Sequence, residues 1–397
     1  MIFRIIFFAV FLHMGYAGMR VTASLDALAI GAGAFQVGIL MSLMAFFPTF
    51  LSMPFGRWMD GAGARKPLFL AIGFLGAAAL IPFALPAASF GIVPLYFCCV
   101  FDGIGFMCLQ MSTLQLMGFL STPESRTNAF SWLAMAYAGS GLVSPVIAGH
   151  AIDFFSHRAA FGISLAFIAL GLALFLLNLR AVPAAWGAAK ERKKKKGAFD
   201  LLTIPKVRNV LLVSALISMA WELENFMFPV YGHEIGLTAS EIGWLLGVFY
   251  SGTFLVRVLM PILSRRITPW QFMVLVLGLG AACYAAFPLF RTLPPLIAVA
   301  FFLGLGLGAS QPNVMTLLHN QTPKGRVGEA LGIRTMLRNA AHSALPVGFG
   351  VITASIGVFW IFMAQAALMA AAAVAAQFRD RTGEDDDEGE ELEERRS

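Results

Sequence analysis

Several charged side chains lie within long apolar stretches of the sequence, where a charge is costly. They are Arg20, Asp102, Glu222, Glu224, Arg257, Arg334 and Arg338, and two titratable histidines, His13 and His342, lie in similar surroundings. Charges within a membrane normally face a protein interior or a water-filled cavity, where they mark substrate or ion pathways. The sequence therefore predicts a polar site enclosed by apolar helices.

Helical spacing predicts which of these residues share a face. Arg334, Arg338 and His342 recur every four residues, which places them on one face of a helix. The same rule places Gln110 on the face of Asp102.

Two neighbouring carboxylates cannot both face one cavity. Glu222 and Glu224 are two residues apart, about 200° around a helix. An internal repeat aligns Asn225 with Arg20, and Glu222 lies one turn before Asn225, so Glu222 is the preferred cavity residue. We expect Arg20 to pair with a carboxylate or with the negative charge of a substrate. Asp26 is expected at the outer rim.

The complete predicted substrate or ion-coupling set is Arg20, Asp102, Gln110, Glu222, Glu224, Asn225, Gln311, Asn313, Arg338 and His342. For several buried polar residues a second role is open. Arg334 could extend to the membrane interface instead, and Arg257 could form a gate ion pair. His13 fits the role of a core histidine better than that of a ligand. Gln110 and Gln311 could bind substrate or bridge two helices.

The composition indicates the elements that must hold these residues. The 397 residues are 58% hydrophobic and 13% charged, with a mean hydropathy of +0.77. A soluble domain of this kind would expose too much apolar surface, so we expect a helical multi-pass membrane protein.

The four cysteines lie in the predicted membrane spans and are expected to be buried apolar residues, with no metal or cofactor. Twelve spans are predicted: 3–28, 35–57, 66–87, 90–118, 127–153, 159–180, 207–232, 239–264, 270–290, 294–319, 328–356 and 358–378.

Basic residues predict the orientation of these spans. Of the 28 Lys and Arg residues, only Arg158 and Arg291 fall in loops on the outer side. Basic loops stay in the cytoplasm, so both termini are predicted to be cytoplasmic. The net charge of +6 then reflects orientation and not nucleic-acid binding. We expect a bacterial inner (plasma) membrane protein that acts as a monomer in the lipid bilayer.

The two halves of the chain resemble each other. Gly103 and Gly105 align with Gly304 and Gly306, and "TPESR" at 122–126 aligns with "TPKGR" at 322–326. A parallel repeat of six spans is the plan of one large class of transporters.

The repeat predicts four regions. An N-terminal six-helix bundle covers 1–180, a basic cytoplasmic linker 181–206 and a C-terminal six-helix bundle 207–378. The acidic segment 379–397 is expected to be a disordered cytoplasmic tail, because it cannot bury a core. The lysine run of the linker could attract anionic lipid, although the need to keep this loop in the cytoplasm is enough to explain the run.

One loop carries a recognisable motif. "GRWMDGAGARKPL" resembles the signature loop of the major facilitator superfamily, with matching residues Gly56, Asp60, Gly63, Arg65 and Lys66. The resemblance implies that Asp60 faces the start of helix eleven, near Gly328, and latches a cytoplasmic gate. The gate set is Asp60, Arg65, Lys66, Arg257 and Arg334. The second half departs from the pattern, with Pro261 and Arg265 at the glycine and aspartate positions.

A second motif is degraded. "SGLVSPVIAG" at 140–149 resembles the helix-five motif of proton-coupled exporters in that superfamily, keeping only Pro145 and Gly149. A kink for helix packing accounts for it equally well. Such exporters usually carry an arginine where this chain has Cys99, which weakens the analogy.

The resemblance implies a two-bundle transporter that works by alternating access. We expect a secondary transporter, and ATP drive is not expected because the sequence has no phosphate-binding loop of the known type. Proton coupling and export of a small organic anion or zwitterion are favoured. Two alternatives stay open: a proton/multidrug antiporter for lipophilic or cationic compounds, and a non-transport membrane scaffold or receptor. No nucleophile–base or metal constellation indicates an enzyme.

Overall fold

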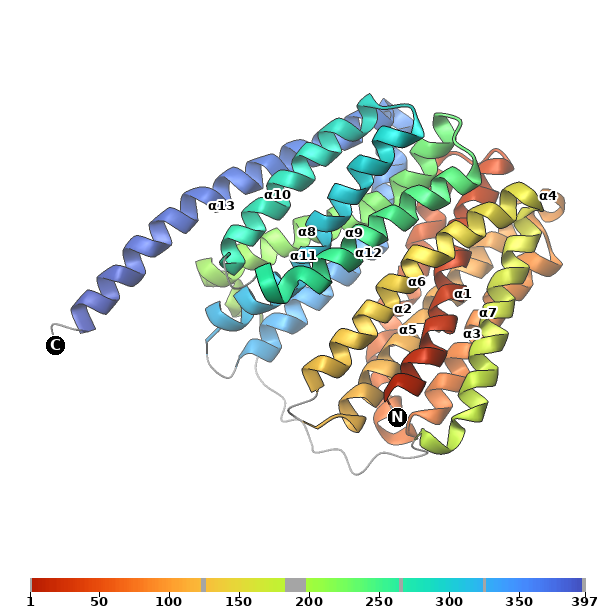
Figure 1. The fold of residues 1–397 in the computed structure, drawn as a ribbon, viewed down its shortest axis with the longest axis horizontal. Helices are drawn as coiled ribbons and strands as arrows, with labels where there is room; N and C mark the ends of the chain where they lie inside the picture. Colours follow the sequence, from red (N-terminus) through yellow and green to blue (C-terminus); the bar gives the residue numbers. More distant parts are fainter. Residues whose placement is uncertain (1, 123–125, 183–197, 264–266, 324–325, 395–397) are drawn as a thin grey trace.

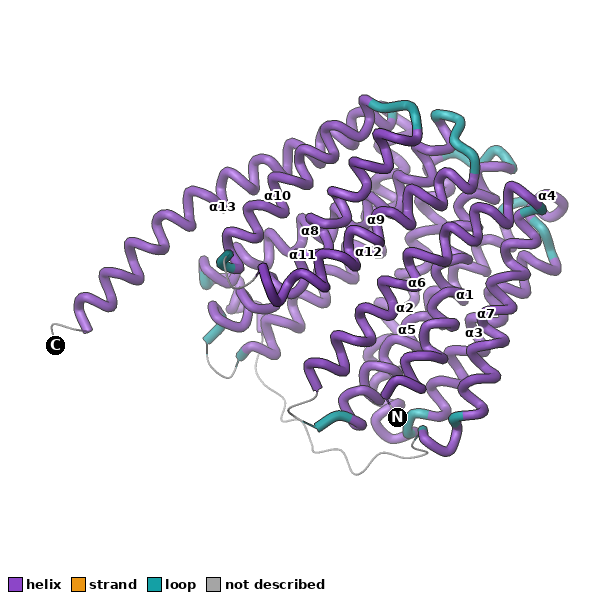
Figure 2. The backbone as a smooth tube through the Cα atoms, in the orientation of Figure 1, coloured by secondary structure: helices purple, strands orange, loops and turns teal. Residues whose placement is uncertain are grey.

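The structure is a computed structural model that describes residues 2–122, 126–182, 198–263, 267–323 and 326–394. Within these ranges the chain is helical and contains no strand (Figure 2). The predicted all-α membrane fold is therefore confirmed. The long helices are α1 (Ile2–Ala29), α2 (Ala34–Ala62), α3 (Arg65–Ala84), α5 (Val93–Leu120), α6 (Arg126–Phe154), α7 (His157–Leu177), α8 (Pro205–Glu234), α9 (Ala239–Leu263), α10 (Pro269–Ala286), α11 (Leu293–Gln321), α12 (Val327–Ile356) and α13 (Val358–Glu394).

Eleven helices of the described chain are long and apolar enough to cross a membrane. The remaining long helix, α12, is more polar because it carries Arg334, Arg338 and His342. A helix that places such residues mid-membrane must turn them toward a protein interior or a cavity.

The helix boundaries differ from the predicted spans at three places. The span 90–118 is divided into α4 (Ala87–Phe90) and α5, because Gly91 adopts a φ of +72° between them. The helix α10 ends at Ala286, where the short 3₁₀ helix η3 (Phe287–Leu289) begins with a proline near its start.

The third difference concerns the acidic tail, for which the composition predicts disorder. The structure continues α13 to Glu394 (Figure 1). In the predicted linker, residues 183–197 lie outside the described chain. Its described ends form the 3₁₀ helices η1 (Leu179–Ala181) and η2 (Ala198–Thr203).

The helices form two groups, α1 to α7 and α8 to α13, which lie on opposite sides of the molecule (Figure 1). Between the groups, α2 packs against α12 and α6 packs against α9. Within the groups, Gly103 and Gly304 play matching roles. A Cβ at Gly103 would collide with the carbonyl oxygen of Met44, and one at Gly304 with that of Phe249. The aligned glycines thus allow α5 to approach α2 and α11 to approach α9.

Close backbone contacts join the two groups at one end of the bundle. We call the end where α1 begins the terminus side and the opposite end the far side. Near the far side, a Cβ at Gly38 would collide with the carbonyl oxygen of Pro346, and a Cβ at Gly243 with that of Pro145. Ser42 Oγ also accepts a hydrogen bond from the Val347 N–H at 3.2 Å. The far side is therefore closed by helix packing.

The helix-five segment takes part in this closure. A Cβ at Gly149 would collide with the Ala239 carbonyl oxygen, and the Pro145 carbonyl lies against Gly243. The small residues of "SGLVSPVIAG" thus have a direct packing role, which is the second of the two interpretations that the sequence leaves open.

Candidate functional site

A central cavity of about 690 Å³ lies between the two groups of helices. Residues of α1, α2, α5 and α6 line one side, and residues of α8, α9, α11 and α12 line the other. The lining residues lie in the middle part of these helices, and on α12 they extend from the middle toward the terminus side, from His342 to Arg334. Cavities of this size hold small organic molecules.

The cavity brings together most of the predicted site residues. Those that line it are Arg20, Gln110, Glu222, Asn225, Arg257, Gln311, Arg334, Arg338 and His342. They come from both halves of the chain and from helices on both sides of the cavity. Tertiary packing thus assembles one polar site from residues that lie far apart in the sequence.

Three predicted site residues do not line the cavity, and for one of them, Glu224, this agrees with the helical argument that favoured Glu222 as the cavity residue. Asp102 and Glu224 have no exposed surface, and their carboxylate oxygens have no hydrogen-bond partner among the described residues. Asn313 is 4% exposed and donates its Nδ2–H to the Ala309 carbonyl. Gln110 comes eight residues after Asp102, and over eight residues a helix rotates about 80° beyond two full turns. That drift explains why Gln110 faces the cavity and Asp102 does not.

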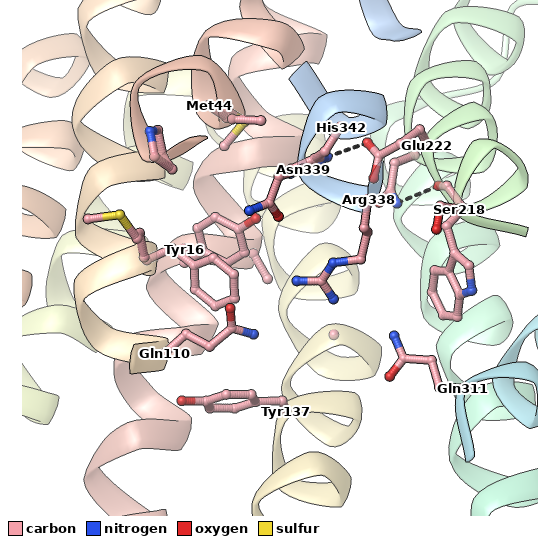
Figure 3. A pocket seen from close by; sticks show the side chains of 18 of the residues that line it. Tyr16, Met44, Gln110, Tyr137, Ser218, Glu222, Gln311, Arg338, Asn339 and His342 are labelled. Atoms are coloured by element: carbon pink, nitrogen blue, oxygen red, sulfur yellow. Dashed lines mark hydrogen bonds and ion pairs between the residues drawn. The ribbon is translucent and has the colours of Figure 1, made fainter. Parts of the chain in front are cut away.

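Glu222 is the centre of the charged cluster (Figure 3). Its Oε2 lies 3.8 Å from Arg20 Nη2 and 2.5 Å from His342 Nδ1. The contact with His342 is ionic only when that histidine is protonated. The side chains of Arg20 and Glu222 are 14% and 12% exposed, so water screens their attraction little. The cluster therefore joins α1 of one group to α8 and α12 of the other.

The four cavity arginines differ in their partners. Arg20 contacts Glu222, Arg334 donates from Nε to Ser214 Oγ at 3.0 Å, and Arg257 donates from Nη1 to the Ala134 carbonyl at 3.3 Å. Arg338 forms no hydrogen bond or ion pair with any described residue. Its guanidinium points into the open space of the cavity, toward Gln110 and Tyr16 (Figure 3). It is therefore available to a ligand.

The charges that line the cavity are strongly unequal. Four arginines face it, whereas Glu222 is the single carboxylate among its lining residues in the described chain. When the charged residues expected to be buried are counted from the sequence, arginines and carboxylates are nearly equal in number, because that count includes Asp102 and Glu224. Removing these two from the cavity leaves a clearly cationic surface.

Aromatic side chains form much of the remaining cavity wall, and sequence reasoning missed most of them. Tyr16, Phe106 and Tyr137 line the cavity on the α1–α7 side, and Trp221 and Tyr250 line it on the other side. Helical spacing could have predicted two of them, because Tyr16 lies one turn before Arg20 and Phe106 one turn before Gln110, on the same helix faces.

His13 also faces the cavity rather than the core. Its ring stacks on Tyr137 with centroids 4.4 Å apart, and its Nδ1 has no hydrogen-bond partner among the described residues. The interpretation of His13 as a satisfied core histidine is therefore wrong. Two turns separate it from Arg20 on the same helix face.

The predicted gate residues are dispersed. Arg257 and Arg334 line the cavity, whereas Arg65 donates from Nε to the Val182 carbonyl at 2.8 Å and Lys66 is exposed outside it. The side chain of Asp60, which is predicted to face the start of α12 near Gly328, lies outside the described residues. The latch between them therefore stays a prediction.

A different contact is present at the terminus side. Arg326, just before α12, donates from Nη1 to Asp200 Oδ2 at 2.7 Å and from Nε to Glu329 Oε2 at 2.8 Å. Asp200 belongs to η2, so this contact ties the end of the linker to α12. The hydrogen bonds from Arg326 lower the pKa of Asp200 below its usual value. Nothing in the local sequence indicated this pairing.

A second interaction joins the two groups at the far side. Asp153, at the end of α6, accepts hydrogen bonds from the backbone N–H groups of Ala239 and Ser240 at 3.1 and 2.7 Å. These residues begin α9, so a carboxylate from one group caps a helix of the other. Such a cap satisfies free N–H groups and interacts favourably with the helix dipole.

Comparison with known sequences identifies the family. Residues 5–346 and 210–396 match the sequence family described as "Major Facilitator Superfamily". Multidrug resistance protein 1 of Bacillus subtilis (strain 168) is 23% identical over 239 residues, which cover 59% of this chain and 58% of that protein. The chain thus spans less than two thirds of that relative. An uncharacterised MFS-type transporter of the same organism, YhjO, is 23% identical over 345 residues, 86% of this chain and 83% of that protein.

Comparison with solved structures shows the same fold. The crystal structure of a POT family transporter in complex with a thioalcohol-conjugated peptide superposes with a TM-score of 0.76, at 16% identity, over 96% of each chain. At this identity the likeness concerns the fold alone. The sequence match over most of the chain and the arrangement of its helices agree: the chain belongs to the Major Facilitator Superfamily of membrane transporters.

Proposed function

We propose that this protein is a proton-coupled secondary transporter of a small organic anion or zwitterion. The observation that carries this proposal is the cationic cavity, in which Arg338 has no partner among the described residues. An arginine side chain that faces a cavity and has no carboxylate partner in the protein is suited to bind a carboxylate or phosphate of a ligand.

The packing supports alternating access as the mechanism. The far side is closed by the contacts of α2 with α12 and of α6 with α9, while the lining residues of α11 and α12 extend from the middle of these helices toward the terminus side. If the terminus side is cytoplasmic, as the basic loops predict, this is an inward-facing state. Opening the far side requires the two groups to rock apart there, about a site that stays between them.

The Glu222 cluster supports proton coupling. Glu222 contacts Arg20 across the two groups and His342 within its own group. A substrate anion that pairs with Arg20 would compete with Glu222, and the displaced carboxylate would then take up a proton. Binding of a substrate and of a proton would thus be linked by competition for one arginine.

Substrate and proton that bind together in this way move in the same direction, so an inward-directed proton gradient would drive import. Export, the direction expected from the sequence, requires the opposite linkage and is supported by the name of a relative. One relative, Multidrug resistance protein 1, is named for drug resistance, and export of compounds from a cell is one way to confer resistance. The same relative, with the aromatic cavity wall, favours a multidrug antiporter as the second candidate. Against that candidate, four arginines would repel a lipophilic cation.

A binding experiment tests the proposed substrate charge. Thermal stability of the purified protein is measured against organic anions, zwitterions and lipophilic cations at two pH values. Anions should stabilise the wild type. Arg338→Ala should weaken this binding by about 2 kcal/mol, roughly thirtyfold in Kd, because a charge-assisted contact is lost.

Arg208→Ala is the matched control, since Arg208 is an exposed arginine of α8 outside the cavity. It should bind anions as the wild type does. If cations stabilise the protein and anions do not, or if Arg338→Ala binds anions normally, the proposed substrate class is wrong.

A further inference from the structure

The two groups of helices give the cavity walls of different chemistry (Figure 3). In the described chain, the α1–α7 wall has one arginine, Arg20, which is paired with Glu222, whereas the other wall has three arginines beside Trp221 and Tyr250. Tyr16, Gln110 and Tyr137 face the cavity from the α1–α7 side, and Glu222, Arg338 and His342 face it from the other side. We propose that the substrate is a planar aromatic carboxylate, with its ring against the first wall and its carboxylate on Arg338. This inference rests on the proposed function, because it specifies the anion that the cavity binds.

The first wall is a continuous set of rings. Tyr16 stacks on Phe106 with centroids 3.9 Å apart, and His13 stacks on Tyr137 at 4.4 Å. The two pairs also meet each other, because His13 contacts Phe106 edge-on at 5.5 Å. All four rings line the cavity, and Tyr16 is only 7% exposed. Rings packed in this way lose little freedom when a ligand binds, so their contact area favours a flat, rigid partner.

Further contacts hold the orientation of this wall. The hydroxyls of Tyr137 and Thr113 are 2.9 Å apart, and Thr113 is fully buried in α5. The amide of Gln110 adds polar atoms beside the rings (Figure 3). A ring that carries a heteroatom or hydroxyl could hydrogen-bond with them.

The second wall supplies the positive charge that has no partner among the described residues. The Arg338 guanidinium projects from α12 toward the ring wall, with Gln311 below it in the same view (Figure 3). The indole Nε1 of Trp221 is buried without a hydrogen-bond partner among the described residues, and Trp221 also lines the cavity. A ligand with a ring at one end and a carboxylate at the other matches the two walls. A saturated or purely polar anion matches only one of them.

Three synthetic ligands separate the contribution of the ring from that of the charge. They are 2-naphthoate, its fully saturated decahydro counterpart, and 2-naphthylmethylammonium, with Kd measured by titration calorimetry on the purified full chain. The expected result is that 2-naphthoate binds about tenfold more tightly than the saturated acid, because ring-on-ring contacts add to area burial. The ring-bearing cation should not compete.

Variants locate the preference in the structure. In Tyr137→Leu the preference for 2-naphthoate should fall to below about threefold, while the affinity for the saturated acid stays within about twofold. Tyr137→Phe keeps the ring and should keep the preference, which distinguishes ring loss from misfolding. Tyr96→Leu is the control, since Tyr96 lies on α5 outside the cavity.

Each remaining outcome has a definite meaning. Equal affinity for both acids overturns the aromatic substrate and leaves the anion transporter standing. A preference that survives in Tyr137→Leu places the ring elsewhere and overturns the inference. Binding of the cation alone contradicts both the inference and the proposed function. Binding of none of the three overturns the inference, and the wider anion panel then decides the proposed function.

Discussion

Asp153 should act as a far-side latch between the two groups of helices. Its carboxylate accepts hydrogen bonds from the first N–H groups of α9 at 3.1 and 2.7 Å, although it belongs to α6. Any state in which the far side opens must break both bonds. Removing the carboxylate by Asp153→Ala should therefore destabilise the present state relative to one open at the far side.

The magnitude follows from the kind of contact. Loss of a helix cap costs about 1 kcal/mol. Because Asp153 is exposed to solvent, its hydrogen bonds contribute less free energy than buried hydrogen bonds would. A change of about 1 kcal/mol shifts the equilibrium between the two states about fivefold. The shift is small enough for the protein to remain folded and large enough to detect.

Distances between spin labels provide the assay. Labels at Phe155→Cys and Glu234→Cys report the far-side separation of the two groups, because Phe155 is 78% exposed and Glu234 ends α8 at the same side. The native cysteines are all buried, which limits background labelling. Asp153→Ala should increase the population with a long distance about fivefold.

Glu241→Ala is the matched control. Its carboxylate accepts from the Thr238 N–H at 2.8 Å, so it caps the same helix from within its own group. It should lower stability without changing the distance distribution. If Asp153→Ala leaves the distribution unchanged, or shifts it no more than Glu241→Ala, the latch does not exist.

Three further predictions concern other parts of the molecule. Glu222→Gln should abolish accumulation driven by a pH gradient in proteoliposomes but retain substrate exchange; unchanged accumulation would exclude Glu222 as coupler. Because Arg326 holds the Asp200 pKa below its usual value, their contact stabilises at neutral pH and is lost as the pH falls through that lowered pKa. The melting-temperature deficit of Asp200→Asn should shrink from about pH 7 toward about pH 3, and a constant deficit would contradict this. Gly103→Ala should cost about 1–3 kcal/mol through collision with a carbonyl, whereas Gly73→Ala, with open space around it, should cost almost nothing; equal effects in thermal unfolding would refute the packing role.

The sequence alone was sufficient for the fold, and most of the polar residues that it singled out line the cavity. Long apolar stretches partition into a membrane only as helices, because the backbone must satisfy its own hydrogen bonds there. Hydropathy therefore located the apolar part of each long helix to within a few residues. The spacing of Arg334, Arg338 and His342 correctly placed all three on the face of α12 that lines the cavity. Both of these properties are local to one segment of chain.

The tertiary structure decided which residues face the cavity and which of them are paired. The rotation of a helix in the membrane depends on its neighbours, here on close approaches such as that of Gly103 to Met44, and these turn Asp102 away while Gln110 faces in. Pairing also depends on distant helices: Arg334 meets Ser214 of α8, whereas Arg338 meets no described partner. Hydropathy measures how well each segment partitions into lipid, but it carries no information about contacts between segments. The cationic balance of the cavity, its ring wall and the Asp153 cap all arise from such contacts, so only the packed structure could reveal them.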